Sequence, residues 1–263
     1  MKSLLKFILV SVLTFSMFGL TSCDLTGKEK RKQEAKDMAL RLLEEKYGEK
    51  FEISDAYYDS GLIAYFSPVE HPEVIFEATI SLTDEMLYGD DYPRSIIATR
   101  IQQECEKVLN ELGIDYYVRP YIFSYKINET TCPYTDITSR EYIDALHNED
   151  INVLIDEMDI LYYVFISADN DYDVKMLYDY MIKVISQANV NAGAFEYAII
   201  CDEDLAEVKK RYSKFSLNSS GTGVMMKCSV GAGITDFNTV NKRYEDFYAE
   251  FEEMQNKYKE SFQ

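Results

Sequence analysis

The cysteines are the residues of this chain with the clearest chemical potential. Cys23 follows Leu20, Thr21 and Ser22 at the end of an apolar run. Outside a reducing compartment, the four cysteines that follow Cys23 could form two disulfides, with three possible pairings. The pair to test first is Cys201 with Cys228, because each lies in or at the end of a predicted strand. Cys105 lies on an apolar helical stripe, which favours a buried free thiol. The four cysteines after Cys23 are Cys105, Cys132, Cys201 and Cys228.

The remaining side chains offer little for catalysis or metal binding. There is no CxxC pair and no cysteine–histidine spacing typical of zinc. His71 and His147 each have acids nearby, and such a pair could act as a general base. No GxSxG, HExxH, P-loop or GxGxxG-to-helix motif accompanies them. We therefore expect solvated surface histidines, no catalytic or metal residue, no cofactor and no enzymatic activity.

Two acidic stretches look like ligand loops but are better interpreted as helix caps. Asp169, Asp171 and Asp173 alternate as in a calcium loop, but Val174 stands where the EF-hand requires glycine and Tyr180 where it requires glutamate. Aspartate before a helix accepts hydrogen bonds from its first free N–H groups. The same interpretation applies to Asp90 and Asp91, which precede Tyr92-Pro93. The glycines at 221, 223, 231 and 233 are predicted to be turns at the ends of a strand over 223–230.

The N-terminus has the strongest pattern in the chain. Lys2 and Lys6 precede an uncharged apolar run of 14 residues over 7–20, which suits a signal peptide and is short for a membrane span of about 20 residues. Leu20-Thr21-Ser22-Cys23 resembles the lipobox of bacterial lipoproteins. The resemblance implies removal of residues 1–22 and attachment of diacylglycerol to the Cys23 sulfur. Residues 23–34 would then be a tether, rich in lysine and arginine, between the anchor and the body.

The net charge distinguishes the folded part of the chain from most nucleic-acid-binding and membrane-surface proteins. Lys plus Arg number 27 and Asp plus Glu 46, so the formal net charge is −19. Phosphate binding requires clustered cations, and an anionic leaflet repels such a body. Hydrophobic residues make up 47% of the chain, which argues against disorder. We therefore expect a folded acidic body with no nucleic-acid partner, tethered by lipid to the extracytoplasmic face of the cell membrane.

Hydrophobic periodicity predicts an α+β protein with helices packed on mixed or antiparallel sheets. A polar, turn-rich stretch over 128–138 suggests two similar-sized lobes, at 35–130 and 135–263, with one continuous sheet as the alternative. Two strand–helix–strand stretches, about 74–126 and 160–201, are long enough for parallel pairing. The expected strands are 51–58, 62–67, 74–82, 114–127, 161–167, 194–201 and 223–230. The expected helices begin near residues 30, 92, 139, 171, 202 and 240.

The strand over 114–127 is unusually aromatic. Alternation places Tyr117, Tyr121, Phe123 and Tyr125 on one face together with Arg119. Exposed tyrosine beside arginine is typical of interface cores. Large aromatic side chains more often fill cores, so we expect both faces of this strand to be covered.

A second resemblance covers residues 35–80. The stretch Lys46-Tyr47-Gly48-Glu49-Lys50-Phe51-Glu52 resembles the helix-to-strand junction of uncharacterised Gram-positive (Firmicute) membrane lipoproteins, whose mature chains also begin with a helix. That resemblance carries no known activity, so no function is transferred from it.

Three functions compete on these observations. The first is a non-enzymatic, lipid-anchored domain that binds a protein, for which acidity favours a basic partner, or that acts as an immunity-type protein. The second is a solute- or glycan-binding lipoprotein, against which the chain is short for two full lobes and lacks tryptophan. The third is a hydrolase that uses carboxylates. A flat aromatic and acidic patch would favour the first, a deep cleft the second and clustered carboxylates in a cleft the third.

Overall fold

The structure is a computed structural model. Its first helix runs over residues 29–47. The structure describes residues 29–58, 62–111, 113, 115–167, 190–200, 202–212 and 230–236, with isolated helical residues between 175 and 260. Ala35, Ala39, Leu43 and Tyr47 recur every fourth residue of this helix and are all buried. That spacing places them on one face, so the predicted amphipathic helix is confirmed.

Gly48 ends this helix in the left-handed conformation. Its φ is +71°, and its N–H donates to the carbonyl of Glu44 at 2.9 Å. Replacing Gly48 with alanine should lower the free energy of unfolding by about 1 kcal/mol, because a Cβ disfavours this backbone conformation. An added Cβ would meet only an ordinary contact, 3.9 Å from the Cβ of Arg140. Chemical denaturation measures the change.

Gly89→Ala is the matched control for that prediction. An added Cβ at Gly89 meets nothing within 4 Å, and its φ lies outside the left-handed region. This variant should unfold at nearly the wild-type denaturant concentration. Equal losses in the two variants would mean that the left-handed backbone of Gly48 is not the cause.

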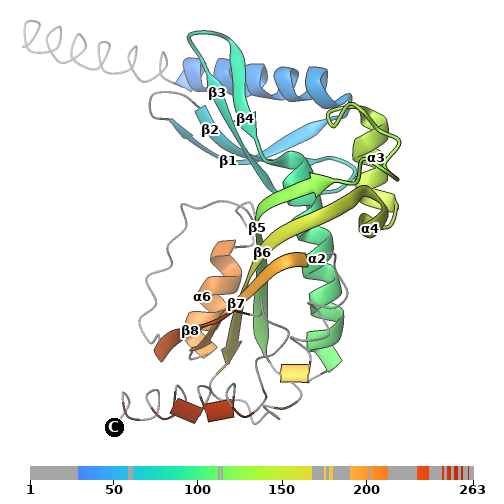
Figure 1. Ribbon diagram of the computed structural model, residues 1–263. Coiled ribbons are helices and arrows are strands. Elements are labelled where there is room, and N and C mark those ends of the chain that lie inside the picture. The colour runs from blue at the N-terminus through green and yellow to red at the C-terminus, as the bar shows by residue number, and fades with distance from the viewer. Residues whose placement is uncertain are drawn as a thin grey trace, which may run out of the picture.

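The first sheet is an antiparallel meander in the order β1-β2-β3-β4. Its inner face is apolar, and the first helix covers it (Figure 1). Leu62, Ala64 and Phe66 of β2 alternate inward and pair with Ile80, Ala78 and Phe76 of β3. The strands are β1 (Phe51–Tyr58), β2 (Leu62–Pro68), β3 (Phe76–Ser81) and β4 (Met86–Asp90).

The second sheet is mixed, in the order β5-β6-β7-β8. β5 pairs antiparallel with β6, β6 parallel with β7, and β7 antiparallel with β8. Figure 1 shows α2 and α6 on opposite sides of this sheet. The strands are β5 (Tyr116–Ile127), β6 (Ile155–Ser167), β7 (Val190–Ile200) and β8 (Val230–Asp236), and the helices are α2 (Tyr92–Glu111), α3 (Arg140–Asn148), α4 (Ile151–Leu154) and α6 (Asp202–Tyr212).

The chain is therefore an α+β protein with helices on antiparallel and mixed sheets, as the periodicity predicts. The parallel pairing expected within 160–201 is confirmed by β6 and β7. The corresponding expectation for 74–126 is wrong, because β3 and β5 belong to different sheets. The alternative of one continuous sheet is wrong for the same reason.

The division between the two sheets falls before the polar stretch at 128–138. β5 belongs to the second sheet, so the second sheet begins before the boundary at 130–135 that composition suggests. A single buried cluster also spans both halves, including Phe76 of β3 and Tyr162 of β6. Pairing of β5 with β6 decides this arrangement, because an antiparallel strand pair must lie in one sheet whatever the linker composition.

Two local predictions for the strands are corrected by the structure. Gly231 and Gly233, expected to be turns, lie inside β8, whereas residues 223–229 of the predicted strand lie outside the described residues. In β5 the register shifts between Ile122 and Ser124, so a bulge at Phe123 breaks the alternation. Tyr125 consequently packs against the main core rather than sharing the face of Tyr117.

Coverage of the other β5 face is uneven. Tyr117 packs with Phe165 and with Leu205 and Val208 of α6, and Arg119 is buried. Phe123, by contrast, is 57% exposed and forms an edge contact with Tyr121 at 4.9 Å between centroids. The expectation that both faces are covered is therefore wrong at the Phe123 end of the strand.

Candidate functional site

Both histidines of the chain meet at the corner where the first helix, the β2–β3 loop and α3 come together. The His71 and His147 rings stack with 3.7 Å between centroids and 11° between planes. His147 follows the buried residues of α3, whose N-cap Ser139 accepts from the Tyr142 N–H at 3.2 Å. Both histidines are half-buried, so the expectation of solvated surface histidines is wrong.

A buried carboxylate and a tyrosine complete this histidine cluster, defined as Glu49, His71, Tyr92, Arg140 and His147. The Tyr92 hydroxyl donates to Glu49 Oε1 at 2.7 Å and lies 3.3 Å from His147 Nε2. Glu49 follows the turn at Gly48, and Tyr92 begins α2. The contacts therefore join segments that are more than 40 residues apart in the sequence.

Arg140 balances the charge of the cluster. Its guanidinium contacts Glu49 Oε2 at 3.2 Å, Glu70 Oε2 at 3.1 Å and Asp144 Oδ1 at 2.8 Å. The Glu49 side chain is only 4% exposed. Burial raises the pKa of Glu49, while the hydrogen bond from Tyr92 and the charge of Arg140 oppose that rise. The arrangement is a satisfied structural network, because each buried polar group has a partner.

Burial also changes the titration of His147. Desolvation lowers the pKa of His147 to about 3, and the charges of His71, Arg100 and Arg140 act in the same direction. The imidazole is therefore neutral at physiological pH. The ring stacks on His71 and contacts the Tyr92 hydroxyl. It therefore joins α2 and α3 and does not present a base to solvent.

The lowered pKa predicts a loss of stability in acid. Between pH 7 and 5 the unfolded chain takes up a proton at His147 that the folded chain does not, so unfolding becomes easier as pH falls. The wild type should lose up to about 2 kcal/mol more than His147→Gln over that interval. Denaturant unfolding at several pH values measures the difference.

Titration of Glu49 has the opposite effect on stability, and Glu49 is present in both the wild type and His147→Gln. Its pKa is raised in the folded state, so its carboxyl makes the folded state relatively more stable as pH falls. The difference between wild type and His147→Gln cancels this contribution. Parallel stability curves for the two proteins from pH 7 to 5 would contradict burial of a neutral His147.

Asp90 and Asp91 act partly as the sequence predicts. Asp90 Oδ1 accepts from the Tyr92 N–H at 3.2 Å, which is a capping contact. The same carboxylate contacts Tyr47 Oη at 2.5 Å and Lys46 Nζ at 2.7 Å, so it also fixes the end of the first helix. Asp91 accepts from the Glu77 N–H at 2.6 Å and so holds the start of α2 against β3.

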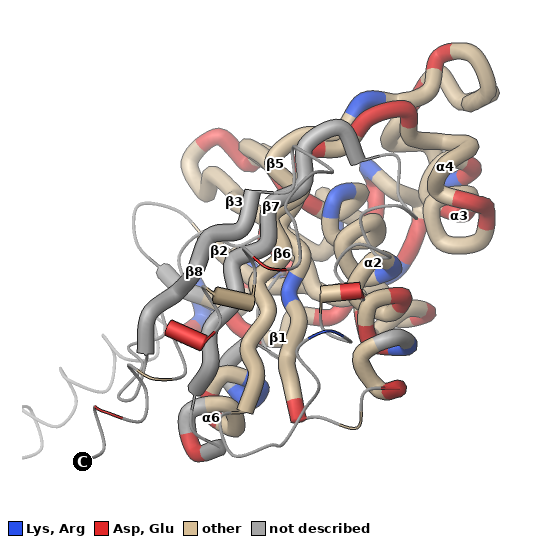
Figure 2. Tube along the Cα trace, turned by 60° about the horizontal axis from the view of Figure 1, so that its bottom comes forward, with Lys and Arg blue, Asp and Glu red and all other residues tan. Residues whose placement is uncertain are grey.

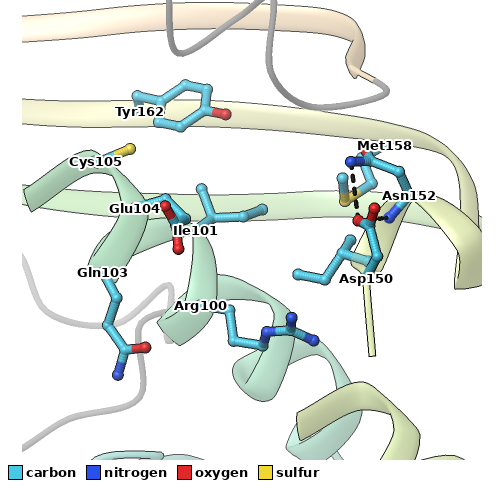
Figure 3. Close-up of a pocket in the computed structure, with 10 residues that line it drawn as sticks. Arg100, Ile101, Gln103, Glu104, Cys105, Asp150, Asn152, Met158 and Tyr162 are labelled. Carbon is cyan, nitrogen blue, oxygen red and sulfur yellow. Dashed lines mark hydrogen bonds between the residues drawn. The ribbon is translucent and has the colours of Figure 1, made fainter. Parts of the chain in front are cut away.

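A pocket of about 370 Å³ opens beside α2, between that helix, α4 and β6. Figure 3 shows Ile101, Cys105, Met158 and Tyr162 on its inner side. Ile101 is 8% exposed and the other three are nearly fully buried, so the floor is apolar. The prediction of a buried free thiol at Cys105 is confirmed. The rim is formed by Arg100, Gln103, Glu104, Asp150, Ile151 and Asn152.

Arg100 connects this pocket to the histidine cluster. Its guanidinium donates to the carbonyls of Leu146 and of Glu149, the latter at 2.6 Å, and so caps the end of α3 directly after the cluster. Burial lowers the pKa of Arg100, and the charges of Asp150 and Glu104 oppose that change.

A third feature is the β4 edge, defined as Asp84, Glu85, Met86 and Tyr88. β4 is the last strand of the first sheet. Met86 is 47% and Tyr88 65% exposed. Asp84 accepts from Ser81 Oγ at 2.7 Å and from Tyr88 Oη at 2.9 Å, which lowers its pKa and keeps it ionised. The edge therefore combines exposed apolar surface with negative charge.

Several predicted site residues lie outside the described part of the chain. These are the lipid-attachment residue Cys23, the predicted disulfide pair Cys201 and Cys228, and the acidic stretch Asp169–Asp173. Within the described ranges, no group of three or more histidine, cysteine or acidic residues is arranged to hold a metal ion. Nor do the described helices include one that is both long and apolar enough to cross a membrane.

Sequence reasoning did not single out Glu49, Tyr92, Arg100, Arg140 or the β4 edge. Glu49, Tyr92 and Arg140 meet only through tertiary packing, as does Arg100 with the end of α3. β4 is short, and neither of its exposed apolar residues belongs to a long alternating run. The presence of only two histidines was the one signal pointing toward the cluster, but nothing in their flanking residues indicates that they touch.

Comparison with known proteins shows a likeness of fold. No protein-family model and no curated protein matches the chain. It resembles the crystal structure of a DUF5037 family protein from Ruminococcus gnavus, with 17% sequence identity and a TM-score of 0.55. The match covers 81% of this chain and 96% of that protein. At this identity the likeness concerns the α+β fold alone.

Proposed function

We propose that this protein is a non-enzymatic, lipid-anchored domain on the extracytoplasmic face of the cell membrane that binds a basic protein partner. The lipobox-like sequence ending at Cys23 supports the anchor. The net charge of −19 supports a basic partner, because complementary charge speeds and orients association. Figure 2 shows acidic segments on the helices and loops of both halves of the described chain.

The β4 edge is the observation that carries partner binding. An exposed sheet edge offers main-chain groups to an added strand, and neighbouring side chains give such binding its specificity. Here Met86 and Tyr88 supply apolar contact area, while Asp84 and Glu85 supply charge that attracts lysine and arginine. This combination supports partner binding, the function for which an aromatic and acidic patch is expected.

A photo-crosslinking residue at position 88 tests the proposal in cells that make the protein. We expect Tyr88 replaced by a photoreactive amino acid to yield one dominant covalent adduct with a basic protein. The same replacement at Ile137, which is 41% exposed and lies outside β4, is the control and should yield none. Equal adducts at both positions, or none at either, would count against the β4 edge.

A direct measurement should follow on the identified partner. Tyr88→Lys places a cation on the β4 edge, so it should weaken binding at least tenfold by repelling a basic partner and removing aromatic contact area. Ile137→Lys adds the same charge elsewhere and should leave the dissociation constant unchanged. Higher salt should weaken wild-type binding, because exposed charge pairs are screened.

A further inference from the structure

The pocket beside α2 contains a cation without a carboxylate partner. The Arg100 guanidinium has five N–H donors. Its contacts within the described chain are the carbonyls of Leu146 and Glu149, which carry no net charge. Its charge interacts with Asp150 and Glu104 only at longer range, since neither forms an ion pair with it. A half-buried cation of this kind favours an anionic group from outside the chain.

The other side of the rim carries an acid that is also free of an ion pair. Asp150 is the N-cap of α4, and its Oδ1 accepts from the Asn152 backbone N–H at 3.0 Å and side-chain Nδ2 at 3.1 Å. Figure 3 shows the Arg100 side chain extending toward this acid. Glu104 differs, because it is paired with Lys107 at 2.5 Å. The rim therefore presents one available cation and one available anion.

The floor between them is apolar and of suitable size. Ile101 and the half-buried Ile151 provide hydrocarbon surface, whereas Met158 and Tyr162 are almost fully buried, and about 370 Å³ lies within the range of small-molecule sites. A ligand that satisfies all three features carries a carboxylate, an ammonium group and an apolar body close together.

We propose that this pocket binds a free α-amino acid with an apolar side chain. Its carboxylate would face Arg100, its ammonium group Asp150 and its side chain the hydrocarbon surface of Ile101 and Ile151. The proposal does not depend on partner binding at the β4 edge, because β4 lies in the first sheet and the pocket is built on α2, α4 and β6. It gives the protein a small-molecule site beside α2.

The lack of tryptophan in the chain makes a direct binding assay possible. Gln103 lines the pocket and is exposed, so Gln103→Trp introduces a single reporter in the full chain, held in mild detergent. We expect L-leucine to change its fluorescence saturably. Glu111→Trp, at the end of α2 and away from the pocket lining, is the control and should not respond. Calorimetry with L-leucine on the unaltered chain checks that the reporter has not created the site.

Ligand analogues separate the two charged contacts. 4-Methylpentanoate has no ammonium group and leucinamide has no carboxylate, so each should bind at least tenfold more weakly than leucine. Equal affinity for leucine and leucinamide would overturn the role of Arg100. Equal affinity for leucine and 4-methylpentanoate would overturn the role of Asp150. No saturable heat or fluorescence change with leucine up to about 10 mM, a Kd weaker than most metabolite sites, would overturn the site itself.

Asp150→Asn and Glu104→Gln form a matched pair of variants. Asparagine caps a helix as well as aspartate does, so Asp150→Asn removes the charge and keeps α4. It should weaken leucine binding about tenfold and leave 4-methylpentanoate binding unchanged or stronger. Glu104→Gln should leave leucine binding within about twofold, because Glu104 is already paired. Thermal unfolding of both variants verifies that they fold, and equal leucine affinity in the two would contradict the proposal.

Discussion

Phe76→Ala should lower the free energy of unfolding by about 4 kcal/mol. Phe76 is fully buried in β3 and belongs to the main hydrophobic core. Its ring centroid lies 4.6 Å from that of Tyr92, 5.4 Å from Phe51 and 5.7 Å from Phe66. Truncation removes these contacts and leaves a cavity that three rigid aromatic rings cannot readily fill. Denaturant unfolding followed by circular dichroism measures the loss.

Ile63→Ala is the control for the aromatic core. Ile63 lies on β2 of the same sheet, but it points to the opposite face and is 36% exposed. Its truncation should cost about 1 kcal/mol or less, since Ile63 keeps about a third of its surface in water and its loss leaves no enclosed cavity. A comparable loss in both variants would contradict the inward packing of Phe76.

The second large effect concerns the anchor. The variant Leu20→Ala/Ser22→Ala/Cys23→Ala should move the protein from the membrane fraction to the medium or the soluble extracytoplasmic fraction. It removes the sulfur that would carry the lipid, and it creates a small-residue site at which an ordinary secretory signal is cleaved. Each buried CH₂ of an acyl chain contributes about 0.8 kcal/mol to membrane binding, so loss of the lipid should release nearly all of the protein.

Two measurements keep the anchor prediction specific. Cys132→Ala removes a free thiol that is not the proposed site of lipid attachment, and it should leave the protein in the membrane fraction. Mass spectrometry of the wild-type N-terminal peptide should show a chain that begins at Cys23 and carries diacylglycerol. A chain that keeps residues 1–22, or a triple variant that stays with the membrane after their removal, would contradict lipid attachment at Cys23.

Local order could be predicted from the sequence where short-range physics decides it. The stripe Ala35, Ala39 and Leu43, the left-handed end at Gly48 and the cap Ser139 depend on residues within one or two helical turns, so their patterns predict helices with correct boundaries. Alternation likewise predicts β2 and β3. The α+β class follows from the sum of these elements, because each must bury one apolar face.

Tertiary structure decided which elements share a sheet and which side chains meet. The sequence does not specify that β5 pairs with β6 rather than with β3, because strand pairing depends on contacts between segments far apart in the chain. The bulge at Phe123 is another such case. It turns Tyr125 to the other face of the strand, and no local sequence pattern predicts it. The same is true of His71 beside His147 and of Arg100 opposite Asp150. These pairs come from different elements, and only packing of the whole core brings them together.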